Sequence, residues 1–600
     1  MFDRRSLFGD ALDHPGARAV LERFLPGVAA SPMATQFRGG RLGQLVAIVP
    51  SLQDPEHRAA FWEALAEIGD GDVRPPYAPA IAPSATYEGA EVARASARVR
   101  PTPATTRWGL IEVRVDGPSH GNPFVDVDAH ATFRRPDGST ARVGGFYDGD
   151  GEWVFRALAD TEGEWTFETD ATTRSLDGLT GSAHVGPAAS GAHGPVRVDG
   201  FHFRHADGTR HRPLGTTAYA WTHQPDALQE QTLATLTDGP FRKLRMCVFP
   251  KSYLFNANEP EDFVFPGSLT EGFDLERFDP AHFRRLERRL AQLAERDIEA
   301  DLILFHAYDR WGFADLGPAV DDRYVRYVVR RLAAFSNVWW SLANEYDLVW
   351  GKDEDDWERI AAIVGEEDPF AHLISIHNCR PFYDYSRPWI THASVQRVDV
   401  YRTAENTDEW RERWGKPVVI DECAYEGDID QGWGNITGEE MTRRFWEAAV
   451  RGGYVGHGET YLPAPVGEAI MPATAGDDDE VLWWAKGGVL HGSSPARIGF
   501  LERILDEIPD GVLDPAPSDW DVPWAQSKDG SVRVAYFGFN RPRFRTVLLG
   551  EGEWKVEVVD TWNMTVEAVP GTHRGTVRVD LPGRQFLALR VTRVTTGDRP

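Results

Sequence analysis

Cysteine is scarce in this sequence, and long hydrophobic runs are missing altogether. The 600 residues include only three cysteines, at the distant positions Cys247, Cys379 and Cys423. This excludes a disulfide framework and the paired cysteines of a zinc knuckle. No apolar run reaches the ~18–20 residues needed to span a bilayer, and the first residues lack the apolar stretch of a secretion signal. We therefore expect a cytoplasmic protein.

Positive charge is also in short supply. The chain carries 64 basic and 92 acidic side chains, a formal net charge of -28. Because a field of this sign repels phosphate groups, we expect neither nucleic acid nor an anionic membrane as a partner. Nucleotide-binding sequences of the GxGxxG or Walker type are missing after every predicted strand.

The hydrophobic pattern changes along the chain and predicts four units. Residues 1–75 show the three- and four-residue spacing of amphipathic helices. Residues 86–190 and 515–597 alternate apolar and polar positions, as the strands of β-sandwiches do. Residues 197–510 alternate strand and helix patterns. These observations predict a multidomain α/β protein.

The third unit contains eight apolar runs of strand type, most of them separated by helical stretches. The runs cover residues 214–220, 243–249, 300–306, 338–343, 373–377, 390–395, 417–422 and 453–459. Eight strands with helical crossovers are typical of a (β/α)8 TIM barrel. An open, doubly wound sheet is the alternative, and the missing nucleotide-binding sequences disfavour it.

Two glutamates stand out where strands of the predicted barrel end. Glu345 follows the fourth strand and Glu422 ends the seventh. Strands three apart in an eight-stranded ring face each other, so these carboxylates could approach to ~5–5.5 Å. At that separation one carboxylate can attack a sugar while the other protonates the leaving oxygen. Asp421 competes with Glu422, because a one-residue shift in register exchanges the two faces of the strand.

Other side chains at the strand ends are candidates for binding a sugar. Asn344 offers an amide to a sugar hydroxyl, and Tyr425 could donate a hydrogen bond that keeps Glu422 ionised. Arg245 could hold the charge of the nucleophile or form an ion pair inside the barrel. Further candidates for hydrogen bonding or ring stacking are His306, Arg310, Trp311, His377, His392, Gln396, Glu459 and Trp221.

The histidines leave a second interpretation open. His306, His377 and His392 could converge with a glutamate on a metal ion, which would make the protein a metal-dependent hydrolase. They lie on different strands without HxH or HExxH spacing, so we expect neither a metal nor an organic cofactor. A third interpretation, a non-catalytic carbohydrate-binding protein, predicts the loss of one glutamate, and both are present.

The sequences around both glutamates resemble a known family. Asn337-Val-Trp-Trp-Ser-Leu-Ala-Asn-Glu345 and Lys416-Pro-Val-Val-Ile-Asp-Glu422 are similar to the acid/base and nucleophile strands of clan A (family 5-like) retaining glycoside hydrolases. The chain more closely resembles a bacterial group of glycosidases in which an immunoglobulin-like domain of unknown function precedes a TIM barrel and a small β-domain follows it. The segments that carry this second resemblance are 145–151, 163–165, 299–313, 375–379, 391–396, 559–565 and 581–583.

The resemblance covers about residues 86–597 and carries expectations for the site. It implies Glu345 as acid/base and Glu422 as nucleophile, with sugar-binding roles for Asn344, His306, His392 and Tyr425. We expect a carbohydrate substrate, a small glycoside or oligosaccharide that is cleaved from its end. The helical segment 1–75 lies outside the resemblance, and we expect it to cap the site or to mediate homo-oligomerisation.

Overall fold

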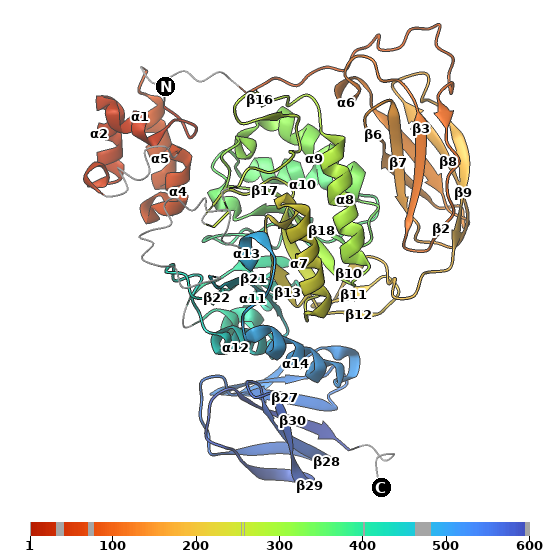
Figure 1. The fold of residues 1–600 in the computed structure, drawn as a ribbon. Helices are drawn as coiled ribbons and strands as arrows, with labels where there is room; N and C mark the ends of the chain where they lie inside the picture. The colour runs from red at the N-terminus through yellow and green to blue at the C-terminus, as the bar shows by residue number, and fades with distance from the viewer. Residues whose placement is uncertain are drawn as a thin grey trace.

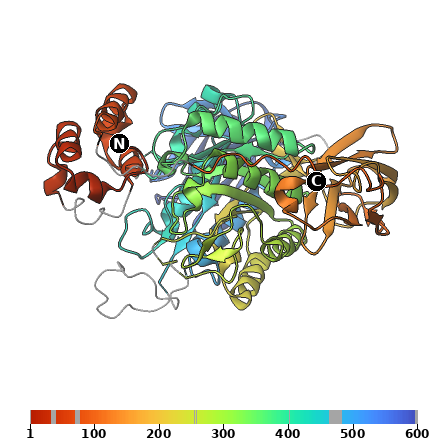
Figure 2. The same ribbon diagram turned by 90° about the horizontal axis from the view of Figure 1, so that it is seen from above.

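The computed structural model describes residues 2–31, 41–69, 77–253, 255–256, 258–399, 402–462 and 482–594. Figure 1 shows a central barrel with three smaller units around it: helices at the N-terminus, a β-sandwich and a C-terminal β-domain. In the view from above (Figure 2), the helical unit and the sandwich lie on opposite sides of the barrel. Residues 70–75 and 595–597, which we assigned to the first and last units, lie outside the described residues.

The central unit is the predicted TIM barrel. Its eight strands are all parallel to their neighbours, in the order β19-β18-β17-β14-β13-β23-β21-β20. A parallel bridge between His377 and Ser394 joins the two ends of this order. The strands are β13 (Gly215–Thr217), β14 (Lys243–Cys247), β17 (Glu299–His306), β18 (Val338–Asn344), β19 (Ile374–Ser375), β20 (Ala393–Gln396), β21 (Val418–Glu422) and β23 (Tyr454–His457).

Helices cover the outside of the barrel, and local sequence fixes where they begin. The side chain of Asp279 accepts a hydrogen bond from the Ala281 backbone at 2.8 Å, and Pro280 opens the helix that follows. Since these helices cover one face of each strand and the barrel interior covers the other, the strands read as continuous apolar runs. The main crossover helices are α7 (Asp226–Asp238), α8 (Pro280–Ala294), α9 (Pro318–Leu332), α10 (Glu354–Glu367), α11 (Thr407–Trp414), α12 (Gly438–Ala449) and α14 (Ser494–Asp506).

The unit before the barrel is a β-sandwich of two layers, which are antiparallel except where the short strand β2 (Thr105–Thr106) pairs parallel with β9. Its other short strands are β1 (Arg98–Val99) and β6 (Phe146–Tyr147). One sheet has the order β1-β3-β7-β6 and the other β2-β9-β8-β4-β5. Burial alternates along β3 and β8, so that side chains of one face form the core between the sheets. The longer strands are β3 (Leu110–Asp116), β4 (Ala129–Arg134), β5 (Thr140–Gly144), β7 (Glu152–Leu158), β8 (Gly163–Ala171) and β9 (Thr180–Gly186).

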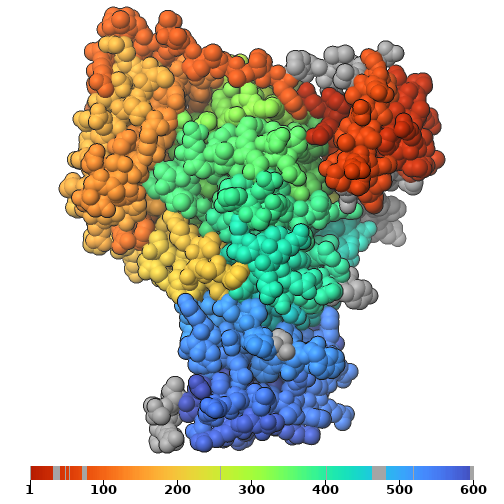
Figure 3. All heavy atoms as spheres, turned by 180° about the vertical axis from the view of Figure 1, so that it is seen from behind, coloured from red at the N-terminus to blue at the C-terminus, as the bar shows by residue number. Residues whose placement is uncertain are grey.

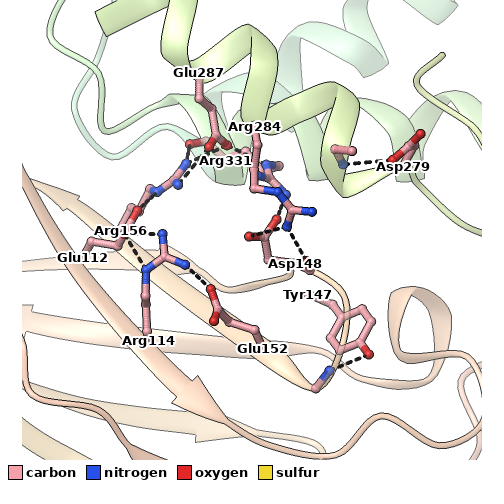
Figure 4. A network of polar contacts seen from close by, with 12 residues as sticks. Glu112, Arg114, Tyr147, Asp148, Glu152, Arg156, Asp279, Arg284, Glu287 and Arg331 are labelled. Carbon is pink, nitrogen blue, oxygen red and sulfur yellow. Dashed lines mark hydrogen bonds and ion pairs between the residues drawn. The ribbon is translucent and has the colours of Figure 1, made fainter. Parts of the chain in front are cut away.

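Buried ion pairs join the sandwich to the barrel helices (Figure 4). Arg156 of β7 lies 2.7 Å from Glu287 of α8, and Arg331 of α9 lies 2.6 Å from Asp148 of the sandwich. Arg331 also bonds Glu287 at 2.6 Å. Because removing one member of a buried pair leaves an uncompensated charge, this network fixes how the two units pack.

The N-terminal unit is helical and has a core of its own. Its helices are α1 (Phe8–Asp13), α2 (Pro15–Phe24), α4 (Leu45–Ile48) and α5 (Pro55–Ala66). Phe8, Leu21, Phe61 and Leu65 are fully buried among them. The Asp54 side chain caps α5 by accepting from the His57 backbone at 2.7 Å. Seen from behind, the unit sits against the upper part of the barrel (Figure 3).

The C-terminal unit is a small all-β domain. Its six strands form an antiparallel sheet in the order β25-β26-β27-β30-β28-β29 around a separate apolar core. They are β25 (Asp514–Asp519), β26 (Val522–Gln526), β27 (Val532–Tyr536), β28 (Phe544–Asp560), β29 (Thr565–Asp580) and β30 (Leu587–Arg593). Among the described residues of the whole chain, no helix is long and apolar enough to cross a membrane.

Candidate active site

The two glutamates lie at the carboxyl end of the barrel strands. Glu345 directly follows β18, and Glu422 is the last residue of β21. Their exposed fractions are only 4% and 7%. Both carboxylates are therefore largely removed from bulk water, where charges interact more strongly than they do in solution.

The backbone of Glu345 adopts an unusual conformation that neighbouring residues hold in place. Its φ of 54° and ψ of 62° fall in the left-handed region, which a side chain other than glycine rarely adopts. The Glu345 backbone N–H donates to Nδ1 of His377 at 3.4 Å, and the Tyr346 N–H donates to the His377 carbonyl at 2.8 Å. Strained residues of this kind cluster at functional sites, where the surrounding structure stabilises them.

The surroundings of Glu345 favour its protonated form. Burial, followed by the negative charge of Glu422, raises the pKa of Glu345 to about 7. The Tyr308 hydroxyl donates a hydrogen bond to its Oε2, and this bond and the charge of Lys251 act in the opposite direction. A carboxyl with a pKa near neutrality can both give and take a proton during a reaction.

Glu422 likewise accepts a hydrogen bond from a tyrosine hydroxyl. The donor is the Tyr219 hydroxyl, which bonds Oε1. The Tyr425 hydroxyl, the predicted donor, lies 3.3 Å from that of Tyr219 and also interacts with Glu422, so two tyrosines contact this carboxylate. Burial and the Glu422 charge raise the pKa of Tyr219 well above its ordinary value, and the phenol therefore remains a donor.

A buried lysine lies between the partners of the two glutamates. Lys251 is 3% exposed, and its Nζ lies 3.8 Å from the ring centroid of Tyr219, 4.4 Å from that of Tyr308 and 4.8 Å from that of Trp484. These distances are those of cation–π contacts. Two of the rings belong to the tyrosines that bond Glu422 and Glu345. The positive charge of Lys251 is therefore placed close to both carboxylates.

Beneath this group, a second set of charges fills the barrel interior. Lys243 donates to Asp301 at 2.7 Å and to Asp421 at 2.5 Å. Arg245 lies 3.3 Å from Asp301 and 3.5 Å from Asp421, and it donates to the Asn344 side-chain oxygen at 2.9 Å. Asp421 is thus held in an interior ion-pair network, whereas Glu422 lies at the mouth. The bond from Arg245 orients the amide of Asn344.

Comparison with known proteins identifies the family. Residues 199–507 match the family described as "Apiosidase-like, catalytic domain". The chain belongs to this apiosidase-like family. Residues 104–172 and 520–592 of the apiosidase-like protein match two domains of unknown function. Among curated proteins, no sequence matches.

Solved structures agree with this assignment. A candidate glycoside hydrolase from Bacteroides vulgatus ATCC 8482 is 35% identical, covers 82% of this chain and 100% of its own, and has a TM-score of 0.75. A family 5 glycoside hydrolase from the same strain is 14% identical, covers 67% of this chain and 94% of its own, and has a TM-score of 0.51. The second likeness concerns the fold alone. The apiosidase-like protein is a glycoside hydrolase with a clan A-like fold.

The structure does not bring several predicted residues of the apiosidase-like protein to the two glutamates. His392 packs edge-on against Trp339 with a centroid distance of 5.1 Å, and burial lowers its pKa to about 4. Trp221 is fully buried and its indole donates to the Met246 sulfur at 3.4 Å. The Glu459 carboxylate accepts hydrogen bonds from the backbone of the segment before α14. These side chains are occupied by the packing of the barrel.

Other predicted residues lie near the mouth but already have protein partners. The His306 ring donates from Nε2 to the Phe249 carbonyl at 3.3 Å, and burial lowers the pKa of His306 to about 3. Arg310 and Trp311 both donate to Glu259, at 2.6 Å and 3.0 Å. The Gln396 backbone donates to Asn378 at 3.1 Å, whereas its side-chain oxygen is buried without a hydrogen-bond partner among the described residues. Among the residues that the structure describes, no three His, Cys, Asp or Glu side chains are grouped as a metal site.

Three residues beside the glutamates of the apiosidase-like protein were missed by sequence reasoning: Tyr219, Lys251 and Tyr308. Each follows the end of a barrel strand, at β13, β14 and β17. The rule that singled out Glu345 and Glu422 therefore applies to them as well. Their role is hidden in the sequence because they act through contacts with residues distant in the chain.

Proposed function

We propose that this glycoside hydrolase works by a retaining, double-displacement mechanism at Glu345 and Glu422. The observation that carries the proposal is the raised pKa of one of two neighbouring carboxyl groups. Glu345 has a pKa of about 7, because it is buried and lies near the charge of Glu422. Each carboxylate accepts a hydrogen bond from a tyrosine hydroxyl, Tyr308 for Glu345 and Tyr219 for Glu422. Paired carboxyl groups in opposite protonation states supply the acid and the nucleophile of a retaining glycosidase.

In the first step, Glu422 attacks the anomeric carbon while the bond to the leaving oxygen breaks. Glu345 gives its proton to that oxygen, so the leaving group departs as a neutral alcohol. The product is a glycosyl ester on Glu422. Lys251 stands close to both carboxylates, and its charge offsets the negative charge that Glu345 acquires on losing the proton.

In the second step, Glu345 acts as a base. It takes a proton from water, whose oxygen attacks the anomeric carbon and displaces the Glu422 carboxylate. Both glutamates return to their starting states, and the sugar is released with its original anomeric configuration. Asn344, whose side-chain oxygen accepts from Arg245, is the residue that we propose donates from its amide nitrogen to a sugar hydroxyl.

We further propose that the enzyme removes a terminal apiofuranosyl residue. The family description supports this sugar, and the low exposure of both glutamates supports a confined subsite for one small ring. Aromatic side chains lie close together around the site. The ring centroid of Trp433 lies 5.0 Å from that of Trp484 and 5.8 Å from that of Tyr425. Such rings can pack against the apolar face of a sugar.

The test is a panel of aryl furanosides and pyranosides of both anomers, which includes the apiofuranoside. It is run with wild type, Glu345→Ala and Glu422→Ala, with and without EDTA. We expect cleavage of the apiofuranoside that is insensitive to EDTA and absent in Glu422→Ala. Azide should restore turnover of Glu422→Ala and give a glycosyl azide of inverted configuration.

Two results would contradict the proposal. Activity that survives Glu422→Ala but is abolished by EDTA would support a metal-dependent hydrolase. Cleavage of a pyranoside with no turnover of the apiofuranoside would retain the mechanism and exclude the proposed sugar. The configuration of the first-formed product, measured by NMR, separates retention from inversion directly.

A further inference from the structure

A cleft separates the N-terminal helices from the barrel. It encloses about 510 Å³, a volume within the range of small-ligand sites. The helical unit contributes Arg4, Arg58 and Trp62 to its wall, and the barrel contributes Asp347, Trp350 and Phe382. Neither the apiosidase-like match nor the two flanking matches includes the helical unit.

Ion pairs and a close backbone approach join the helical unit to the barrel. Arg5 lies 3.1 Å from Asp315, and Arg4 lies 3.7 Å from Asp353. At Gly43 the backbone approaches Trp350 so closely that an added Cβ would lie 2.7 Å from the Cβ of Trp350. With its own buried core, the unit forms a fixed wall.

The barrel side of the cleft begins at the residues that follow Glu345. Tyr346 and Asp347 both line it. The Asp347 carboxylate accepts from the backbone N–H groups of Cys379 at 2.6 Å and Arg380 at 3.0 Å. The Cys379 thiol in turn contacts Glu345. Glu345 is therefore linked to the cleft wall in two ways, through the chain to Tyr346 and through the contacts of Cys379 with Asp347 and Glu345.

The chemistry of the reaction indicates which part of the substrate a cleft next to Glu345 would bind. The acid/base must contact the glycosidic oxygen, so the leaving group extends from the sugar past Glu345. A cleft beside Glu345 is therefore suited to the leaving group rather than to the sugar that is transferred. Trp62 and Trp350 offer ring faces, and Arg58 offers hydrogen-bond donors to hydroxyl groups.

Charge in the cleft indicates a neutral occupant. The basic residues of the wall are Arg4, Arg58 and Lys352, and acidic residues from the start of α10 oppose them. Lys352 is already bonded to Asp321 at 2.6 Å. The wall therefore has four acidic residues (Asp347, Asp353, Glu354 and Asp355) against three basic ones, so it disfavours an anionic ligand and suits a neutral one.

We propose that the N-terminal helical unit and the segment after Glu345 together form a leaving-group subsite for neutral sugar residues. This inference rests on the proposed function, and it makes the physiological substrate an oligosaccharide rather than a simple glycoside. The apiosyl residue would enter the barrel mouth, and the sugars to which it is attached would lie between Trp62 and Trp350.

The experiment compares two substrates with the same apiosyl group. One is apiosyl fluoride, whose leaving group is a single atom and cannot reach the cleft. The other is an oligosaccharide with apiose at its non-reducing end. Both are measured with wild type, Trp62→Ala and Arg58→Ala. Trp520→Ala is the matched control, because Trp520 is 98% exposed in the C-terminal domain.

We expect kcat/KM for the oligosaccharide to fall about tenfold or more in Trp62→Ala and Arg58→Ala. The fluoride should be hydrolysed at the wild-type rate by both variants, and Trp520→Ala should match wild type on both substrates. Equal losses on the two substrates, or no loss on either, would overturn the subsite. If wild type and Glu422→Ala are equally inactive on both substrates, the proposed function itself fails, and the subsite fails with it.

Discussion

Two buried lysines of the same barrel differ in how their charges are paired. Lys243, at the start of β14, is 1% exposed and bonds two carboxylates, Asp301 and Asp421. Lys251, beyond the end of β14, is 3% exposed and lies against aromatic rings. Within the described part of the chain, its Nζ makes no hydrogen bond that the structure shows.

The carboxylic acids close to these two lysines, Asp421 near Lys243 and Glu345 near Lys251, differ in a similar way. Burial alone would raise the pKa of Asp421, but the charges of Lys243 and Arg245 hold this pKa below its ordinary value. Burial and Glu422 raise the pKa of Glu345 to about 7. A saturated network fixes the structure and has little further chemistry to offer. An incompletely paired group retains the capacity to exchange protons and to bind a substrate.

The largest effect is expected from Glu422→Gln. The amide keeps the size of the side chain but cannot attack the anomeric carbon. We expect kcat/KM to fall by about 10⁴-fold or more, with a melting temperature within a few degrees of wild type. Initial rates and a thermal scan measure both quantities. Substantial residual activity would place the nucleophile elsewhere, with Asp421 as the first candidate.

Lys243→Met should act on stability instead. It leaves Asp301 and Asp421 with only Arg245 as a cationic partner in the barrel interior. Breaking a buried pair in this way costs about 3–5 kcal/mol. A denaturant titration followed by the fluorescence of the barrel tryptophans measures the loss. If Lys251→Met costs as much, the two lysines do not differ in the way we infer.

Tyr219→Phe removes the hydrogen bond to Glu422 and should lower kcat/KM about tenfold. Hydrogen bonds to charged groups contribute about 1.5–3 kcal/mol, and part of this is lost when the anion must react without its donor. The control is Tyr454→Phe, whose hydroxyl bonds His202 at 2.8 Å at the opposite end of the barrel. An equal loss in both variants would indicate a packing effect.

The smallest effect is a shift of the pH profile in Lys251→Met. For wild type we expect the alkaline limb of kcat/KM near pH 7, because Glu345 must be protonated and its pKa is about 7. Lys251 lowers that pKa, since a cation favours the carboxylate. Its removal should therefore move the alkaline limb upward, by about half to one pH unit. Lys251→Arg should leave the limb near the wild-type position, and a uniform loss of rate without a shift would indicate a structural role.

Much of the site follows from one rule applied to the sequence. Once the eight apolar runs are recognised, residues at strand ends are expected to face one another, and this rule identifies Glu345 and Glu422. It also selects His392, Trp221 and Glu459, which the structure places in packing contacts instead. The rule gives the edge of the barrel to which a residue belongs, but it does not give the direction of each side chain.

By itself, the sequence determined the barrel, its strand order and the position of two glutamates at strand ends, because the period of apolar residues and the chain order of the strands are local properties. Only the tertiary structure decided that Tyr219 bonds Glu422, where Lys251 lies and that the N-terminal helices share a cleft with the residues that follow Glu345. Hydrogen bonds, cation–π contacts and burial depend on side chains that come together from distant parts of the chain. The pKa of Glu345 arises from those surroundings and from no property of the segment that carries it.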